Sequence, residues 1–331
     1  MLKASRKSYI FLFLFGFMVI FAAFRPIGFD SDSIGYTTWI QNDLIERMAE
    51  PTFALIVAIW DFLSPKEYVP RMVLITYAVF NMLILKLAIN NFSDNKNQAF
   101  FLYFLLLYSI LTLTQIRVGL ASAVFFWAMH DIFNEKKMNF IFKMILSINI
   151  HNLMVIFIPF YFINKRRKPI SYFIFFWPLF VFALLFSNQV FMFFTDILMN
   201  SGMLPIRAES KIISYLNEDG VAISVFNYHT SFVLVVYFLA LSRVTHLNQK
   251  DFFLLECVGY GMVLYFLTTF MTVMSGRVLN VVVLMCIVLV PGVVRGFKDK
   301  YLVLVFLYIY AFALFLNTHL RNNLLDFGVF F

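Results

Sequence analysis

The chain has 331 residues, of which 62% are hydrophobic, 45 are phenylalanine and only 13% are charged. Soluble domains carry about 25% charged residues, and apolar runs recur here from end to end, so the composition excludes a soluble enzyme and predicts an all-α polytopic integral membrane protein. The net charge of +8 does not indicate nucleic-acid binding, because the basic residues stand in short clusters between apolar runs, as cytoplasmic loops do.

The first apolar run, residues 9–24, follows a basic segment at Lys3–Lys7. Ala22-Ala23 is a poor cleavage site, so we expect a retained first helix with a cytoplasmic N-terminus rather than a removed signal peptide. Residues 25–67 then form an extracytoplasmic loop. Within it, the run 52–63 is too short to cross a hydrocarbon core of about 30 Å, and we predict a re-entrant or surface-lying helix there.

The stretch 138–163 interrupts the alternation of crossings, because basic residues flank both of its ends. Two half-helices that meet near residues 149–152 would keep both basic clusters in the cytoplasm, and a single crossing that breaks the charge rule is the alternative. About nine to eleven crossings in total are expected in one transmembrane domain, residues 1–331, with a second outer loop at about 195–226. The other crossings are expected at residues 68–90, 99–116, 117–133, 170–194, 227–243, 252–274, 278–294 and 301–319.

Three arginines from distant helices fall at the extracytoplasmic face in this topology: Arg25, Arg117 and Arg277. A guanidinium is always charged and binds phosphate oxygens as a fork, so the set is predicted to bind a diphosphate and to stabilise the charge that grows as it leaves. The alternative for each arginine is a side chain that extends to the lipid head groups. Both Gln115-Ile116-Arg117 and Ser275-Gly276-Arg277 open directly into long apolar helices, which favours the diphosphate site.

Asp30-Ser31-Asp32 has the D-x-D pattern that often holds a divalent cation in nucleotide-sugar transferases. The pattern is too short to carry that assignment, and two carboxylates supply fewer oxygen ligands than a metal needs, so we predict no metal site. We expect one aspartate to act as general base for an acceptor hydroxyl, and the other to orient it or to pair with Arg25. A solvated loop without a catalytic role is the alternative.

His151 lies at the tip of the predicted half-helix pair, where it would donate to a phosphate, serve as an alternative base, or simply be a satisfied buried histidine. Tyr36 and Trp39 are candidates to stack on a sugar, although tyrosine and tryptophan are also common at membrane interfaces without a ligand. Arg207, Lys211 and Tyr215 share one face of a helical segment in the second outer loop. They either contact the lipid-linked substrate or, as we favour, line the rim of the membrane.

The residues that carry a family resemblance follow one another as Arg25, Gly28-x-Asp30-x-Asp32, Tyr36, Glu50-Pro51, Gln115 to Ala121, Ile150-His151 and Gly276-Arg277. Over roughly residues 20–295 this ordered set resembles the EpsG family, the Wzy-like polymerases of bacterial exopolysaccharide and O-antigen assembly. The gap between the aspartates and Tyr36 departs from the family pattern, so the resemblance does not decide which aspartate is the base.

The resemblance implies a GT-C-like helical bundle and a lipid-linked glycosyltransferase of the bacterial inner membrane, working on its outer face without a nucleotide sugar or cofactor. Such an enzyme transfers a glycan from undecaprenyl diphosphate to a hydroxyl of a second lipid-linked repeat unit. Its expected partners are that donor and acceptor, the lipid bilayer and, as a further candidate, a chain-length regulator protein. Because arginines can take the place of a metal at the leaving diphosphate, metal independence is expected.

Two other functions stay open from the sequence. A flippase or transporter of lipid-linked oligosaccharides would also use arginines, around a cavity that opens alternately to each side and often with inverted repeats, which are not evident in this sequence. A membrane acyltransferase would modify the surface polysaccharide without changing its chain length.

Overall fold

The computed structural model describes residues 6–42, 50–163, 166, 170–200, 227–321 and 325. These residues form helices and no β-strand, apart from one isolated antiparallel bridge between Asp30 and Leu325. The predicted all-α fold class is thereby confirmed. The chain divides into two compact units, Met1–Tyr161 with Tyr301–Phe331, and Phe162–Lys300. The organisation as one transmembrane domain stays a prediction.

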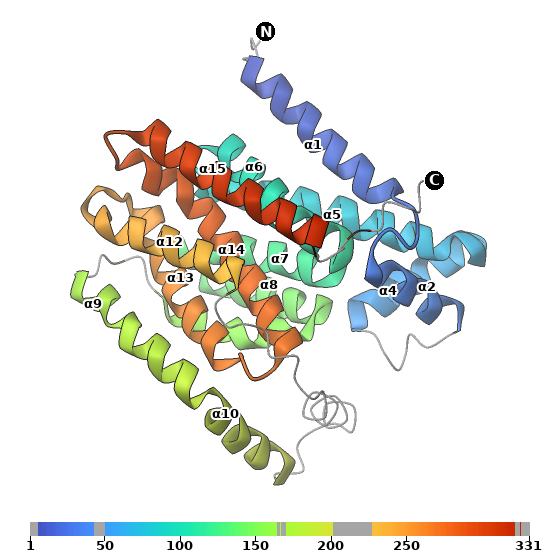
Figure 1. The fold of residues 1–331 in the computed structure, drawn as a ribbon. Helices are drawn as coiled ribbons and strands as arrows, with labels where there is room; N and C mark the ends of the chain where they lie inside the picture. Colours follow the sequence, from blue (N-terminus) through green and yellow to red (C-terminus); the bar gives the residue numbers. More distant parts are fainter. Residues whose placement is uncertain are drawn as a thin grey trace. The chain divides into compact units, whose positions relative to one another are not determined.

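The first unit is built around α7, most of whose side chains are buried, with α5 and α8 packed against it. Helices α1, α2 and α4 pack in turn against α5, and Figure 1 shows α2 and α4 beside the end of α1. Its helices are α1 (Arg6–Phe24), α2 (Ser31–Gln41), α4 (Pro51–Leu63), η1 (Lys66–Tyr68), α5 (Val69–Phe92), α6 (Lys96–Leu106), η2 (Tyr108–Thr114), α7 (Ile116–Phe133), α8 (Lys137–Ile150), η3 (Asn152–Phe162), α15 (Lys300–Leu316) and η5 (Asn317–Arg321).

The segment predicted as the first outer loop contains a helix, α2, that the sequence analysis did not predict. Asp30 is its N-cap residue, because the backbone is extended there and the side-chain Oδ1 accepts a hydrogen bond from the Ser33 amide at 2.9 Å. An aspartate at this position satisfies one of the free amides of the first turn. The predicted D-x-D loop is therefore the start of a helix, with Asp32 in its first turn.

Helix boundaries in the structure coincide with two of the predicted departures from simple crossings, and that neither segment crosses the membrane stays a prediction. Helix α4 has 13 residues, about 20 Å of helix at 1.5 Å per residue, which matches the short helix expected at 52–63. The predicted break near residues 149–152 lies at His151, whose backbone is extended at φ −154° and ψ 119° between α8 and η3.

The apolar run at 99–116, expected as one crossing, is bent in the structure. α6 ends at Leu106, and the π-helix η2 follows it at an angle of 72°. The Gln115 amide donates to the Ile110 carbonyl at 2.7 Å, which is the five-residue spacing of a π-helix. Side chains hold this segment, since the Tyr103 hydroxyl lies 2.7 Å from Thr112 Oγ1 and Asn81 Nδ2 donates to the same oxygen at 3.2 Å.

Four helices among the described residues are long and apolar enough to cross a membrane, or five if α6 and η2 form one bent span. The protein is therefore a multi-pass membrane protein, whereas the count of nine to eleven crossings stays a prediction. The four segments are Lys66–Phe92, Ile116–Phe133, Val273–Arg295 and Lys300–His319.

The second unit is built around α13, which packs against α10 and α14, with α12 against α14. Close packing of α13 and α14 depends on Gly261, where an added Cβ would lie 2.7 Å from a methyl group of Val282. An ion pair of 2.8 Å between Arg295 and Asp251 joins the same two helices. The elements of this unit are α9 (Ile170–Ile174), α10 (Phe176–Asn200), α12 (Tyr228–Ser242), η4 (Val244–His246), α13 (Gln249–Leu267) and α14 (Thr272–Arg295).

Candidate functional site

Glu50 is the point at which two of the predicted site residues meet in the first unit. Its Oε2 accepts from Nη1 of Arg117, in the first turn of α7, and its Oε1 lies 3.9 Å from Nε2 of His151, at the end of α8. The side chains of Arg117, Glu50 and His151 are only 11%, 5% and 8% exposed. The fold thus brings Arg117 and His151 together around one almost fully buried carboxylate.

Aromatic rings surround the guanidinium of Arg117. Its Cζ lies 5.3 Å from the ring centre of Tyr36, 5.1 Å from Trp39 and 5.5 Å from Phe53, distances at which cation–π attraction operates. We call these three residues, from α2 and α4, the aromatic cage. Nε of Arg117 is buried without a hydrogen-bond acceptor, so the group still has a donor for a further anion.

The positions of Arg117 and His151 are fixed by contacts one helical turn away. Ser147 Oγ donates to the Ala121 carbonyl at 2.7 Å. Ser147 lies four positions before His151, and Ala121 lies four positions after Arg117. Gly119 allows η2 to approach α7, since a Cβ at this position would lie 1.8 Å from the Leu111 carbonyl oxygen. The glycine of the Gln115–Ala121 segment is therefore needed to place the arginine.

One hydrogen bond of His151 indicates which of its ring nitrogens carries the proton. The Leu153 amide donates to Nδ1 at 3.2 Å, so Nδ1 is an acceptor and the neutral ring carries its proton on Nε2. Nε2 is the nitrogen that faces Glu50. Of the roles predicted for His151, this geometry favours a hydrogen-bond donor over a base.

Arg25 is completely buried, at 1% exposure, and its guanidinium is bound on three sides. Nε pairs with Asp30 Oδ2 at 2.9 Å, and the two terminal nitrogens each donate at 2.5 Å to a carbonyl, those of Ala22 and Leu113. Asp30 is thus the aspartate that pairs with Arg25, one of the two alternatives expected for it. The expected contact between Arg25 and a diphosphate is not supported, because this guanidinium links α1, α2 and η2 and has no exposed surface.

Asp32 is half-buried in the first turn of α2 and differs in this respect from Asp30. The Tyr36 hydroxyl donates to Asp32 Oδ2 at 3.4 Å, which connects this carboxylate to the aromatic cage. With Asp30 held by Arg25, Asp32 is the aspartate better placed to meet a substrate.

The remaining predicted residues lie elsewhere in the chain. Arg277 is half-buried in the second turn of α14, in the second unit, and its Nε is buried without an acceptor. Its convergence with Arg117 stays a prediction. Arg207, Lys211 and Tyr215 lie outside the described residues. Within the described ranges, no three His, Cys, Asp or Glu side chains are grouped as metal ligands.

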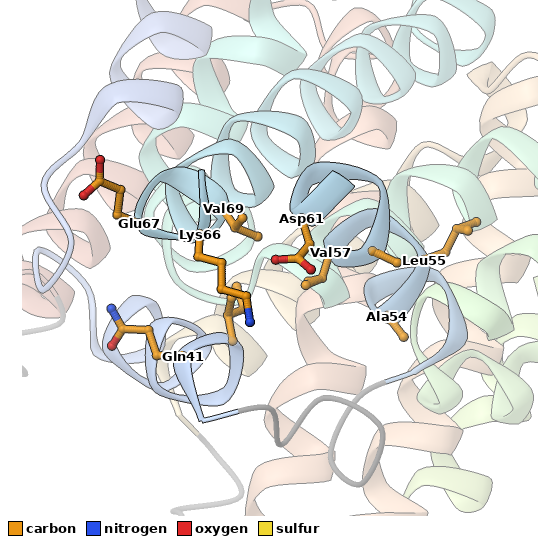
Figure 2. Close-up of a pocket in the computed structure, with 10 residues that line it drawn as sticks. Gln41, Ala54, Leu55, Val57, Asp61, Lys66, Glu67 and Val69 are labelled. Atoms are coloured by element: carbon orange, nitrogen blue, oxygen red, sulfur yellow. The ribbon is translucent and has the colours of Figure 1, made fainter. Parts of the chain in front are cut away.

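A pocket of about 880 Å³ lies beside the aromatic cage, between α2, α4, η1 and the start of α5 (Figure 2). Ile40 and Val57 in its wall stand one helical turn from the cage residues Tyr36 and Phe53. The full lining is Ile40, Gln41, Ala54, Leu55, Val57, Ala58, Asp61, Lys66, Glu67 and Val69.

Sequence reasoning missed the role of Glu50, although this residue belongs to the ordered set quoted above. Glu50 is the extended residue before α4, and Pro51 opens that helix. A glutamate directly before an apolar helix is a signal for a paired, functional carboxylate. Phe53, three positions later, carried no such signal, because its ring is an ordinary apolar residue until the fold places Arg117 against it.

A comparison with known families matches the model of the EpsG family to residues 8–328. No curated protein and no solved structure matches the chain.

Proposed function

Because the chain belongs to the EpsG family, we propose that it is a polysaccharide repeat-unit polymerase of the bacterial inner membrane, with its active site on the outer face. The bond between the anomeric carbon of the donor glycan and undecaprenyl diphosphate breaks, and its electron pair leaves with the diphosphate. The oxygen of an acceptor hydroxyl forms the new bond to that carbon, and its proton passes to a carboxylate.

The observation that carries this proposal is the meeting of Arg117, His151 and Glu50. A leaving diphosphate needs cationic and donor groups where its charge develops, and Arg117 supplies a guanidinium at the N-terminal end of α7, where the helix dipole also favours an anion. His151 adds the Nε2 donor. In this arrangement the Glu50 carboxylate occupies the anion position beside Arg117, and the diphosphate displaces it on binding.

The other groups complete the site. Asp32, joined to the cage through Tyr36, is the base for the acceptor hydroxyl. The binding of Arg277 to the second phosphate stays a prediction; this residue lies near the N-terminal end of α14, in the second unit, and its Nε is buried without an acceptor. Arg25 and Asp30 hold the backbone around them. Since arginines neutralise the leaving group, the reaction is metal-independent, and its two substrates are a lipid-linked donor and a lipid-linked acceptor.

The test is the size of surface polysaccharide from a deletion strain that expresses the wild type or Arg117→Ala. We expect Arg117→Ala to replace the long-chain ladder by single repeat units on the lipid, at the outer leaflet. The exposed Arg166→Ala serves as the matched control and should keep the ladder. A normal ladder from Arg117→Ala at normal protein abundance would remove this residue from the mechanism.

The same strains separate the competing functions. Repeat units that accumulate on the inner leaflet after deletion would identify a flippase instead of a polymerase. A change in acetyl content with unchanged chain length would identify an acyltransferase.

A further inference from the structure

We propose that the pocket between α2, α4, η1 and the start of α5 binds sugar rings of the acceptor glycan. This inference rests on the proposed polymerase function and assigns a place in the protein to one of its two glycans. We call this pocket the acceptor pocket.

The size and lining of the acceptor pocket fit a short oligosaccharide. Its volume of about 880 Å³ lies within the 300–1,000 Å³ that is usual for small-molecule sites. Apolar side chains of α4 form one wall, Gln41 belongs to the lining, and Figure 2 shows the side chains of Asp61 and Lys66 directed toward the same space. Such a mixture suits a sugar, which presents apolar ring faces and a rim of hydroxyl groups.

The polar side chains in the pocket are available to a ligand. Asp61, Lys66 and Glu67 are exposed, and within the described part of the chain their side chains form no hydrogen bond or ion pair. Carboxylates accept hydrogen bonds from hydroxyls, an ammonium donates them, and the amide of Gln41 does both. Because the lining contains two carboxylates and one ammonium, the pocket favours neutral sugars over acidic ones.

The acceptor pocket lies between the same two helices, α2 and α4, that carry the aromatic cage. Asp32, Tyr36 and Ile40 are spaced by four residues and so share one face of α2, as Phe53, Val57 and Asp61 share one face of α4. The two faces meet where the rings of Tyr36 and Phe53 lie 5.6 Å apart. The pocket begins one helical turn beyond this contact, about 6 Å along each helix.

The position of the base assigns the pocket to the acceptor. The donor sugar is held by its diphosphate at Arg117, whereas the acceptor must bring a hydroxyl to Asp32. Asp32 lies on the same face of α2 as Ile40, two turns or about 12 Å away, with Tyr36 between them. An oligosaccharide with one end in the pocket can follow this face past Tyr36 and place its terminal hydroxyl at the carboxylate.

The experiment uses the full-length protein in lipid nanodiscs, a lipid-linked donor from the producing strain, and the repeat-unit oligosaccharide released from its lipid by mild acid. The released oligosaccharide has no diphosphate, so it can serve only as acceptor. Wild type should extend it to longer water-soluble products. Asp61→Asn and Glu67→Gln should each raise its half-saturating concentration about tenfold, the usual effect of losing a hydrogen bond to a charged group, without changing that of the donor.

Two further variants make this result specific. Ala58→Trp fills the pocket without changing any charge and should also raise the half-saturating concentration of the oligosaccharide. Asp94→Asn, an exposed carboxylate between α5 and α6, is the matched control and should change neither concentration. Unchanged values for Asp61→Asn, Glu67→Gln and Ala58→Trp would overturn the proposal, as would a change in the donor value alone, which would place the donor glycan in the pocket.

Saturation-transfer NMR of the released oligosaccharide on the same nanodiscs separates this inference from the proposed function. If wild type extends nothing but binds the oligosaccharide, and Asp61→Asn weakens that binding, the pocket is a sugar site and the polymerase function fails. If wild type polymerises lipid-linked repeats and the pocket variants do not alter binding, the function holds and the pocket assignment fails.

Discussion

The carboxylate of Glu50 pairs with the guanidinium of Arg117 across 67 positions of sequence, at a site where both side chains are almost completely removed from water. An ion pair in such surroundings is costly to form and more costly to break, because the remaining partner is left buried with its charge uncompensated. The pair also reaches His151, so three separate segments depend on one carboxylate.

Replacing Glu50 by glutamine should move stability and ligand affinity in opposite directions. The change leaves Arg117 without its counter-charge and should lower the free energy of unfolding by roughly 3 kcal/mol. It also removes the anion that competes for Arg117, so the purified Glu50→Gln protein should bind undecaprenyl diphosphate more tightly than wild type. Thermal unfolding in detergent and titration with this lipid measure the two effects.

The control for this prediction is Glu67→Gln, which removes a carboxylate outside the ion pair. It should leave both diphosphate affinity and melting temperature near the wild-type values. Weaker diphosphate binding by Glu50→Gln would show that the carboxylate supports the ligand site instead of competing for it.

Arg25 and Arg117 should respond differently to replacement by lysine. An ammonium retains the charge but cannot contact Asp30 and the carbonyls of Ala22 and Leu113 together, so Arg25→Lys should lower the free energy of unfolding by about 1–3 kcal/mol. Polymer per molecule of folded protein should then be preserved. Arg117→Lys should remove polymer with a smaller loss of stability, because lysine can still pair with Glu50.

A double-mutant cycle between Arg25 and Asp30 checks the structural half of this prediction. Arg25→Lys and Asp30→Asn should be non-additive in unfolding free energy, as expected for a pair at 2.9 Å. If Arg25→Lys abolished polymerisation in a protein of normal stability, Arg25 would belong to the reaction after all.

Much of the helical architecture could be predicted from the sequence because apolar runs and basic clusters report how a chain crosses a membrane. The segments now seen as α7 and α14 were found in this way, and the break at His151 followed from basic residues on both sides of one run. The π-helix η2 could not be predicted, because its hydrogen-bond pattern depends on contacts of Thr112 with Asn81 and Tyr103, which the fold alone brings together.

The candidate site was predicted less completely, for a related reason. Arg25 and Arg117 both follow the pattern of an arginine at a helix end, and only their partners distinguish a buried structural arginine from one beside a pocket. Glu50 was given no role in the sequence analysis, although its position directly before the apolar helix α4 was a signal; its partners Arg117 and His151 are known only from the fold. Asp30 could have been recognised as a helix cap, because aspartate is a favoured residue directly before the first turn of a helix.

Replacing Gly119 by alanine should disturb the site without touching any charged group. A Cβ there would overlap the Leu111 carbonyl oxygen at 1.8 Å, so η2 or the start of α7 must move, at a cost of about 1–3 kcal/mol. Because Arg117 lies two residues earlier, polymer yield should fall along with the melting temperature. Gly16→Ala, at a helical glycine with nothing within 4 Å, is the control and should retain both.

The two amide replacements of His151 should distinguish a donor from a base. If Nε2 donates to the diphosphate, His151→Gln should keep more activity than His151→Asn, because a glutamine amide reaches the position of Nε2 and an asparagine amide reaches only that of Nδ1. The shape of the pH–rate profile should be the same in wild type and His151→Gln, since a neutral donor does not have to lose a proton before the reaction. Single-turnover polymerisation at several pH values measures both. If both variants are equally inactive, and the pH–rate profile of their residual activity has lost its acidic limb, the opposite conclusion follows. His151 is then the base, and Asp32 orients the acceptor.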